Sequence, residues 1–369
     1  MFPISRLLMF LALVCTAAAA VAAPPLPPVH HVIVLVLENQ SFEATFGRPS
    51  ARSYLTHTLP SKGVLLRNYY AIGHYSLPNY IAMISGQGPN DATQMDCPQF
   101  SELNASTDSL DRDGQLPGVG CVYPASVGTL ASQLQAAGLR WRAYMEDMGN
   151  DLQRERATCA HPDVGGVDRT EQAQATDQYA TRHDPFVYFH GVIDDAARCN
   201  DTVVNLNELP HDLERIETTP NFIFITPNLC NDGHDKPCVD GKTGGLDAID
   251  GFLREWMPRI EKAPAFRADG MLVVTFDESG TVNPDGSTAC CGERGLPGMT
   301  NPPGLAGPGG GRVGAVVISR FVRPGSVSVV PYNHYALLKS VETIFGLPAL
   351  GYAGAPGLRI FGPDVFKAR

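Results

Sequence analysis

The most informative absence in this sequence is that of a long apolar run beyond its first residues. No later stretch reaches about eighteen consecutive apolar residues, the length typical of a membrane span. Clusters of Lys and Arg are also absent, and the net charge is −10. Charge alone is therefore not expected to hold nucleic acid or an anionic membrane surface. No two cysteines have C-x-x-C spacing, which disfavours a zinc site built from paired cysteines.

The amino-terminal segment has the layout of a secretory signal peptide. It contains one Arg, then an apolar run from Leu7, then a string of small residues. Removal of residues 1–22 leaves residues 23–369 as one expected domain, secreted or periplasmic. A lipid anchor at Cys15 is disfavoured because Val14 precedes it, where lipid-attachment sites need a small residue. We therefore expect no stable membrane anchor.

The cysteine count predicts disulfide bonds. Of the nine cysteines, Cys15 leaves with the signal peptide, and an even number remains in a chain expected to be exported. Four bridges are the expectation, and the sequence cannot choose among the possible pairings. Bridges between sequence neighbours, Cys97 with Cys121 and Cys230 with Cys238, would close short loops.

Apolar runs alternate with helical patterns along the chain. The runs at 30–39, 221–228, 270–278 and 312–322 are rich in β-branched residues and Leu, which is typical of parallel strands buried on both faces. Amphipathic helical patterns occupy 127–138, 245–263 and 334–348. The order predicts an α/β fold with a central, mostly parallel sheet sandwiched by helices. Residues 87–125 and 279–311 are rich in turn residues and are expected to be surface loop insertions.

Polar side chains follow three of the apolar runs. Glu38 and Asn39 follow the first run, Asn228 closes the second, and Asp277 with Glu278 closes the third. In open α/β sheets, ligands bind beyond the carboxyl ends of the strands. Each residue alone has a structural explanation as a cap or turn residue. Several carboxylates in one crevice, however, repel one another unless they are protonated or bound to a cation, so the set predicts a metal site.

Ser76 in "GHYSLPNYIAMISG" fits two interpretations. As a structural residue it is a good N-cap, because Pro78 and Asn79 suit a first helical turn and Gly86 ends the pattern. As a nucleophile it would face the positive end of the helix dipole, which favours a phosphate and an ionised oxygen. The two roles are compatible. His74 lies two residues earlier, and its direction is not predicted.

Several segments resemble one known family. "LENQSFEATFG" resembles the E-N-[RQ]-S-F-x-x-x-F-G signature of the phosphoesterase family that includes bacterial phospholipases C and metal-dependent acid phosphatases, within the alkaline-phosphatase-like superfamily. Further colinear blocks are similar to that family: "HYSLPNYIAMISG", "WRAYMEDM", "RHDPFVYF", "TPNLCNDGHD", "TFDES" and "NHYALLKSVETIFGLPALG". The resemblance extends from about residue 30 to residue 351. It implies an alkaline-phosphatase-like fold.

The resemblance also implies roles for individual residues. Ser76 is implied to be the nucleophile that becomes transiently phosphorylated. His183 and His234 are implied to contact the phosphoryl oxygens or to protonate the leaving group. Asp232 and Asp235 are implied either to orient the His234 ring or to join the metal shell.

The metal ligands implied by the resemblance are Glu38, Asn39, Ser76, Asp277 and Glu278, with His334 at the position of a late metal-binding histidine. Such an oxygen-rich set favours calcium, magnesium or manganese over zinc. Zinc stays possible, since the superfamily often uses two zinc ions. A second zinc site is in doubt because Asp-Glu stands here where many relatives have Asp-His.

The expected function is metal-dependent hydrolysis of phosphate esters. An acid phosphatase is favoured over a phospholipase C because the chain ends at "FGPDVFKAR", whereas phospholipases of this family usually carry added C-terminal domains. A Ser-His-Asp carboxylic esterase is a distant alternative, since "GHYSLPN" lacks the G-x-S-x-G elbow. A catalytically silent binding protein would have lost the nucleophile or the ligands, and neither is missing.

Overall fold

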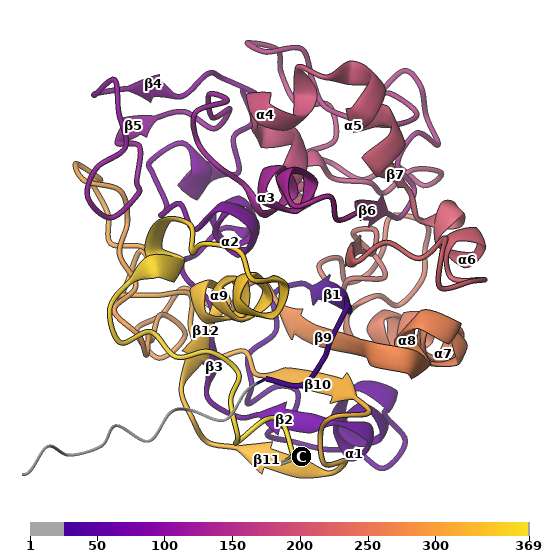
Figure 1. Ribbon diagram of the computed structural model, residues 1–369. Helices are drawn as coiled ribbons and strands as arrows, with labels where there is room; N and C mark the ends of the chain where they lie inside the picture. The colour runs from indigo at the N-terminus through magenta and orange to yellow at the C-terminus, as the bar shows by residue number, and fades with distance from the viewer. Residues whose placement is uncertain (1–25, 368–369) are drawn as a thin grey trace, which may run out of the picture.

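An eight-stranded sheet forms the centre of the computed structural model, which describes residues 26–367 (Figure 1). The predicted signal peptide lies outside the described residues. The strands follow one another across the sheet in the order β11 (Ser326–Ser328), β2 (Val64–Leu66), β10 (Ala315–Ser319), β9 (Gly270–Phe276), β1 (His31–Leu37), β8 (Phe222–Thr226), β6 (Trp141–Met145) and β7 (Val203–Asn205). Two short pairs lie outside it: β3 (Tyr69–Tyr70) with β12 (Tyr332–Asn333), and β4 (Asn104–Ala105) with β5 (Gly118–Val119).

The predicted central strands are confirmed. Strand β1 pairs in parallel with β8 on one side and with β9 on the other, and every residue of these three strands is buried. Strands β6 and β7 extend the parallel part of the sheet. Apolar side chains on both faces require cover on both faces, which the helices supply.

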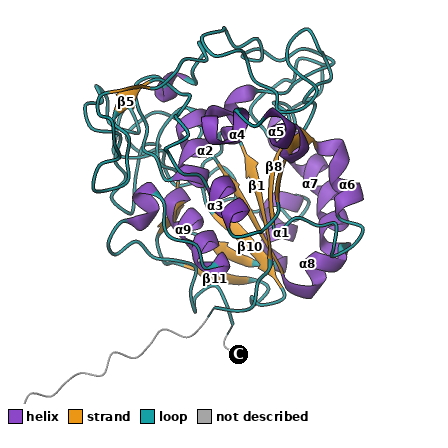
Figure 2. Cartoon of the chain, turned by 45° about the horizontal axis from the view of Figure 1, so that its top comes forward, coloured by secondary structure: helices purple, strands orange, loops and turns teal. Residues whose placement is uncertain are grey.

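Two groups of helices sandwich the sheet (Figures 1 and 2). One group consists of α2 (Ser76–Ser85), α3 (Leu130–Ala136) and α9 (His334–Phe345), which pack against one another. The opposite group includes α1 (Leu59–Lys62), α7 (Gly245–Lys262) and α8 (Pro264–Asp269). The short helices α5 (Ala196–Thr202) and α6 (Leu209–Asp212) lie near the β7 edge, and α4 (His190–Ile193) packs against α3 and α5. The three predicted helices are therefore present, and the α/β sandwich is confirmed.

Strand β10 differs from the prediction that the run at 312–322 repeats the parallel form. It pairs antiparallel with both β9 and β2. The physical reason lies in its connection, because residues 279–311 link β9 to β10 without a helix or strand of their own. Parallel neighbours need a crossover, whereas a chain that returns directly along the same edge pairs antiparallel.

The loop segments and the cysteines agree with the sequence analysis. Residues 279–311 are irregular, and residues 87–125 contain only a short 3-10 turn (Thr93–Met95) and the β4–β5 pair. The four bridges expected from the cysteine count are formed, and they include the two neighbour pairings named above, Cys97–Cys121 and Cys230–Cys238. Two further bridges join Cys159 to Cys199 and Cys290 to its neighbour Cys291. Within residues 26–367, no helix combines the length and apolar character needed to cross a bilayer.

Candidate active site

Ser76 is the first residue of α2, and Tyr75 rather than Ser76 occupies the N-cap position. The predicted capping role is therefore wrong. Another group takes that role, because the Asp96 Oδ1 atom accepts the Leu77 N–H at 2.9 Å. The Ser76 side chain is consequently free of the helix end, and its hydroxyl donates to Glu38 Oε2 at 2.9 Å. The structure thus joins the candidate nucleophile to a strand-end acid.

Buried acids gather at the carboxyl ends of β1, β8 and β9. Glu38, Asp232 and Asp277 are each fully buried. The backbone holds them together, since Glu38 N–H donates to Asp232 O and Asp277 N–H donates to Leu37 O, both at 2.9 Å. Burial, followed by repulsion from Asp277 and Asp232, raises the pKa of Glu38 well above its ordinary value. Burial also raises the pKa of Asp277 to about 6.

His183 lies between two of these acids. Its Nε2 is 3.5 Å from Glu38 Oε1, and its Nδ1 is 3.3 Å from Asp232 Oδ2. Its ring stacks on Tyr80, with centroids 5.3 Å apart and planes 12° apart. Burial lowers the pKa of His183 well below its ordinary value, so the neutral ring can offer a lone pair to a ligand. One ligand atom each from Glu38, His183 and Asp232 lies within 4.8 Å of the others.

The residues present fit a metal ion. Three atoms are buried and have no hydrogen-bond partner among the described residues: Asp232 Oδ2, Asp277 Oδ2 and His183 Nε2. Buried polar atoms of native proteins are almost always satisfied by protein, water or an ion. Three carboxylates and one imidazole, all shielded from bulk water, form a donor set that suits a divalent cation.

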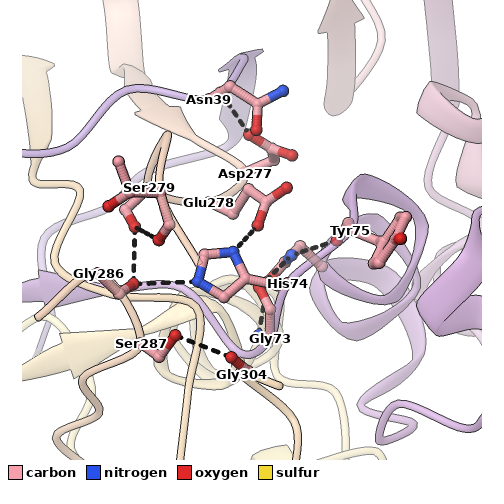
Figure 3. Close-up of polar contacts among 12 residues, drawn as sticks. Asn39, Gly73, His74, Tyr75, Asp277, Glu278, Ser279, Gly286, Ser287 and Gly304 are labelled. Carbon is pink, nitrogen blue, oxygen red and sulfur yellow. Dashed lines mark hydrogen bonds and ion pairs between the residues drawn. The ribbon is translucent and has the colours of Figure 1, made fainter. Parts of the chain in front are cut away.

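Asn39 borders this cluster from the end of β1. Its backbone is left-handed at φ 55°, a conformation that Asn tolerates better than most residues. Its N–H donates to Asp277 Oδ1 at 2.9 Å (Figure 3). Its side-chain amide lies 3.4 Å from Glu38 Oε2. Asn39 therefore connects two of the acids that the sequence placed in one crevice.

Glu278 points to His74 rather than to the other acids (Figure 3). Its carboxyl bonds His74 Nδ1, while His74 Nε2 lies 3.1 Å from the carbonyl oxygen of Gly286. Since a carbonyl only accepts, Nε2 carries a proton, and Nδ1 shares a second proton with Glu278. Burial lowers the pKa of His74 and raises that of Glu278, and both shifts favour the neutral forms of the two groups.

His334 has both ring nitrogens bonded to protein atoms. Its Nε2 donates to the backbone oxygen of Asp277 at 2.6 Å, and its Nδ1 lies 3.1 Å from the Tyr69 hydroxyl. Burial lowers the pKa of His334 to about 4, so the ring is neutral. The structure therefore brings His334 to the backbone of an expected ligand, not to the group of unpartnered acids.

His234 lies at the more open side of the site. Its side chain is 33% exposed, and its ring centroid is 6.1 Å from that of His183. The ring atom Nδ1 lies 2.8 Å from Asp235 Oδ1. The backbone N–H of His234 donates to Asp232 Oδ1 at 2.8 Å. Asp235 therefore orients the ring, one of the two roles left open by the sequence, whereas Asp232 belongs to the buried cluster.

Three residues of the site were not singled out from the sequence. The Tyr80 hydroxyl donates to Glu38 Oε1. Arg182 is buried with its Nε 3.9 Å from Asp96 Oδ2, and the negative charge of Asp96 and of other nearby acids outweighs the effect of burial and raises its pKa. Tyr80 could have been found by spacing, since it lies four residues after Ser76 on the same helical face. No sequence signal relates Asp96 to Arg182.

Comparison with curated proteins finds acid phosphatases. The chain is 26% identical over 315 residues to the phosphate-repressible acid phosphatase of Penicillium chrysogenum, with 85% of this chain and 58% of that protein covered. It is 27% identical over 326 residues to the phosphatidylinositol-3-phosphatase of Mycobacterium tuberculosis, with 88% of this chain and 79% of that protein covered. The chain spans little more than half the length of the fungal enzymes that it matches.

A solved structure shares the fold. A Vibrio parahaemolyticus protein described as belonging to the alkaline phosphatase superfamily aligns with a TM-score of 0.51 and 11% identity, over 89% of this chain and 69% of the other. At that identity the likeness concerns the fold alone. The Phosphoesterase family model matches residues 51–348, which include Ser76, His183, His234 and Asp277, whereas Glu38 and Asn39 precede the matched range. The chain belongs to the Phosphoesterase family.

Proposed function

We propose that this protein hydrolyses phosphate monoesters through a phosphoserine intermediate at Ser76. The observation that carries the proposal is the hydrogen bond from the Ser76 hydroxyl to Glu38, within a buried acidic cluster at the start of α2. A hydroxyl at a helix N-terminus is well placed to attack a phosphoryl group, because the helix dipole favours the anion. The names of the fungal and mycobacterial relatives, an acid phosphatase and a phosphoinositide phosphatase, support the monoesterase over a phospholipase C.

The proposed steps follow from the positions of the side chains. Glu38 Oε2 lies 2.9 Å from the Ser76 oxygen and accepts the proton that Ser76 loses. The Ser76 oxygen bonds to phosphorus while the bond to the ester oxygen breaks. His234, oriented by Asp235, supplies a proton to the departing oxygen. Water then attacks the phosphorus and gives one proton to His234, while the bond between phosphorus and the Ser76 oxygen breaks. Glu38 returns its proton to that oxygen, so phosphate leaves and the hydroxyl is restored.

We assign the binding of a divalent cation to Glu38, Asn39, Asp232 and Asp277, with His183 and Ser76 beside them. A cation held by these residues would supply positive charge near the Ser76 oxygen and the phosphoryl oxygens. Calcium, magnesium or manganese suits these oxygen-rich donors, and the imidazole of His183 would also accept zinc. Glu278 and His334 act from outside this set, through His74 and through the Asp277 backbone.

We also propose that the protein is exported. The described cysteines form four bridges, and disulfides persist in oxidising compartments such as the periplasm or the extracellular medium. Detection of the protein in the periplasmic or culture fraction, with its amino terminus near residue 23, tests the export proposal. A full-length chain retained in the cytosol would contradict it.

The deciding experiment compares p-nitrophenyl phosphate with p-nitrophenyl phosphorylcholine and p-nitrophenyl acetate. We expect preference for the monoester, loss of activity with a chelator, recovery with a divalent cation, and loss of activity in Ser76→Ala. Ser61→Ala is the matched control, since Ser61 is an exposed serine outside the site. Preference for phosphorylcholine would transfer the assignment to a phospholipase C. Chelator-resistant hydrolysis of the acetate would support a carboxylic esterase. Full activity of Ser76→Ala would show that Ser76 is not the nucleophile.

A further inference from the structure

The turn before Ser76, residues 72–75, has an unusual backbone at its last residue. Tyr75 has φ 69° and ψ 149°, a combination that is rare for residues other than glycine. This conformation leads the chain from the loop into α2 and thereby sets the direction of the Ser76 side chain. Tyr75 is 42% exposed, so tight packing of its own side chain does not account for the strained backbone. Other contacts must hold the turn.

Asn79 supplies four such contacts from within α2. Its Oδ1 accepts the N–H groups of Ile72 and Gly73 at 2.8 and 3.1 Å. Its Nδ2 donates to the carbonyl oxygens of Gly73 and Tyr75, both at 2.9 Å. The side chain is fully buried, and its acceptor and both donors are all used. Asn79 therefore bonds the turn at its beginning, its middle and its end.

The loop 279–311 closes the turn from the other side. The His74 N–H donates to the carbonyl oxygen of Pro303 at 3.0 Å, and a Cβ added to Gly73 would lie 2.7 Å from that same oxygen. The His74 ring bonds Glu278 and the Gly286 carbonyl (Figure 3). The turn is therefore confined outside by the loop and inside by Asn79.

We propose that Asn79 is a positioning residue that holds the strained turn and so aims the Ser76 hydroxyl. This inference rests on the proposed role of Ser76 as the nucleophile. Without the bonds from Asn79, Tyr75 relaxes toward an ordinary backbone conformation and the Ser76 oxygen moves away from Glu38. A misplacement of about 1 Å costs roughly 100-fold in rate. Substrate binding depends on other groups, so we expect the substitution to lower kcat and to leave KM nearly unchanged.

The test begins with Asn79→Asp, which keeps the acceptor for Ile72 and Gly73 but loses both donors. The substitution is nearly isosteric, and thermal unfolding checks that the variant folds. With p-nitrophenyl phosphate we expect kcat to fall roughly 100-fold while KM changes by less than about threefold. If thermal unfolding shows that this variant does not fold, Asn79→Ser carries the same comparison.

A second substitution separates positioning from general stability. Glycine adopts φ 69° without strain, so Tyr75→Gly should need the Asn79 bonds less. We expect the double variant Tyr75→Gly/Asn79→Asp to recover about tenfold in kcat over Asn79→Asp alone, an interaction that independent sites would not show. Equal or lower kcat in the double variant would contradict the role of Asn79 in holding the strained turn.

Asn90 offers a matched control. It is also a fully buried asparagine that accepts from two backbone N–H groups, those of Ala92 and Thr93, and donates to the Gly120 carbonyl. We expect Asn90→Asp to lower the unfolding temperature and leave kcat unchanged. Equal kcat losses in the Asn79 and Asn90 variants, with Ser76→Ala inactive, would overturn the positioning role alone. Full activity of Ser76→Ala would instead overturn the proposed function.

Discussion

Glu342 provides a prediction about stability and pH that is independent of the active site. This residue of α9 is buried, and burial raises its pKa to about 8. One carboxyl oxygen accepts the Leu350 N–H at 2.8 Å, and the other has no hydrogen-bond partner within residues 26–367. The folded protein therefore binds a proton that the unfolded chain releases near pH 4.5. Since the folded state holds more protons between these pH values, stability rises as the pH falls.

The magnitude follows from the span of pH. One pH unit across this window corresponds to about 1.4 kcal/mol, so lowering the pH from about 7.5 to about 5.5 should add roughly 3 kcal/mol of stability from this group. Glu342→Gln keeps an acceptor for Leu350 and removes the titration. We expect urea unfolding of the variant to show a shallower dependence on pH than wild type. Identical slopes in the two proteins would refute the reasoning, whatever other buried acids contribute.

Three further predictions concern the site. Tyr80→Phe removes a hydrogen-bond donor to the buried Glu38 carboxyl. We expect the variant to fold and its kcat to fall about 10-fold to 100-fold. An unchanged kcat would contradict a role for this bond. His234→Ala should slow hydrolysis of alkyl phosphates more than that of p-nitrophenyl phosphate, whose leaving group needs no proton, and equal losses would argue against a general acid. A divalent cation at about 100 times its Kd should raise the free energy of unfolding of the wild-type protein by about 2.7 kcal/mol, measured by thermal unfolding. Asp232→Asn should reduce this stabilisation. An equal stabilisation of the variant would show that the ion binds elsewhere.

Local sequence patterns were sufficient for the central elements. Strand β1 could be predicted because seven consecutive apolar or half-apolar residues suit only a strand covered on both faces. Helix α9 could be predicted because its apolar positions recur at helical spacing and a glycine follows its end. The polar residues after β1, β8 and β9 could be assigned to one edge, since the carboxyl ends of parallel strands meet there.

The same patterns were insufficient where contacts join distant parts of the chain. The bond between His74 and Glu278 spans 204 positions, and no local periodicity relates those residues. The antiparallel pairing of β10 depends on the path of the loop before it, which sequence composition does not specify. The capping of α2 by Asp96 rather than by Ser76 likewise depends on a neighbouring loop. The catalytic and metal-binding roles of the individual residues stay predictions.

The sequence by itself determined the α/β layering, the central parallel strands and the edge of the sheet at which acids collect, whereas the pairing of the cysteines came from the structure. The tertiary structure alone decided that His183 lies between Glu38 and Asp232, that Glu278 turns to His74, and that both Asn79 and the loop 279–311 hold the turn before Ser76. The physical reason is one of range. The periodicity of apolar residues involves neighbours in the sequence and can be recognised from the sequence alone. The direction of a side chain in a crevice depends on contacts with residues that are distant in the sequence and adjacent only in the folded protein.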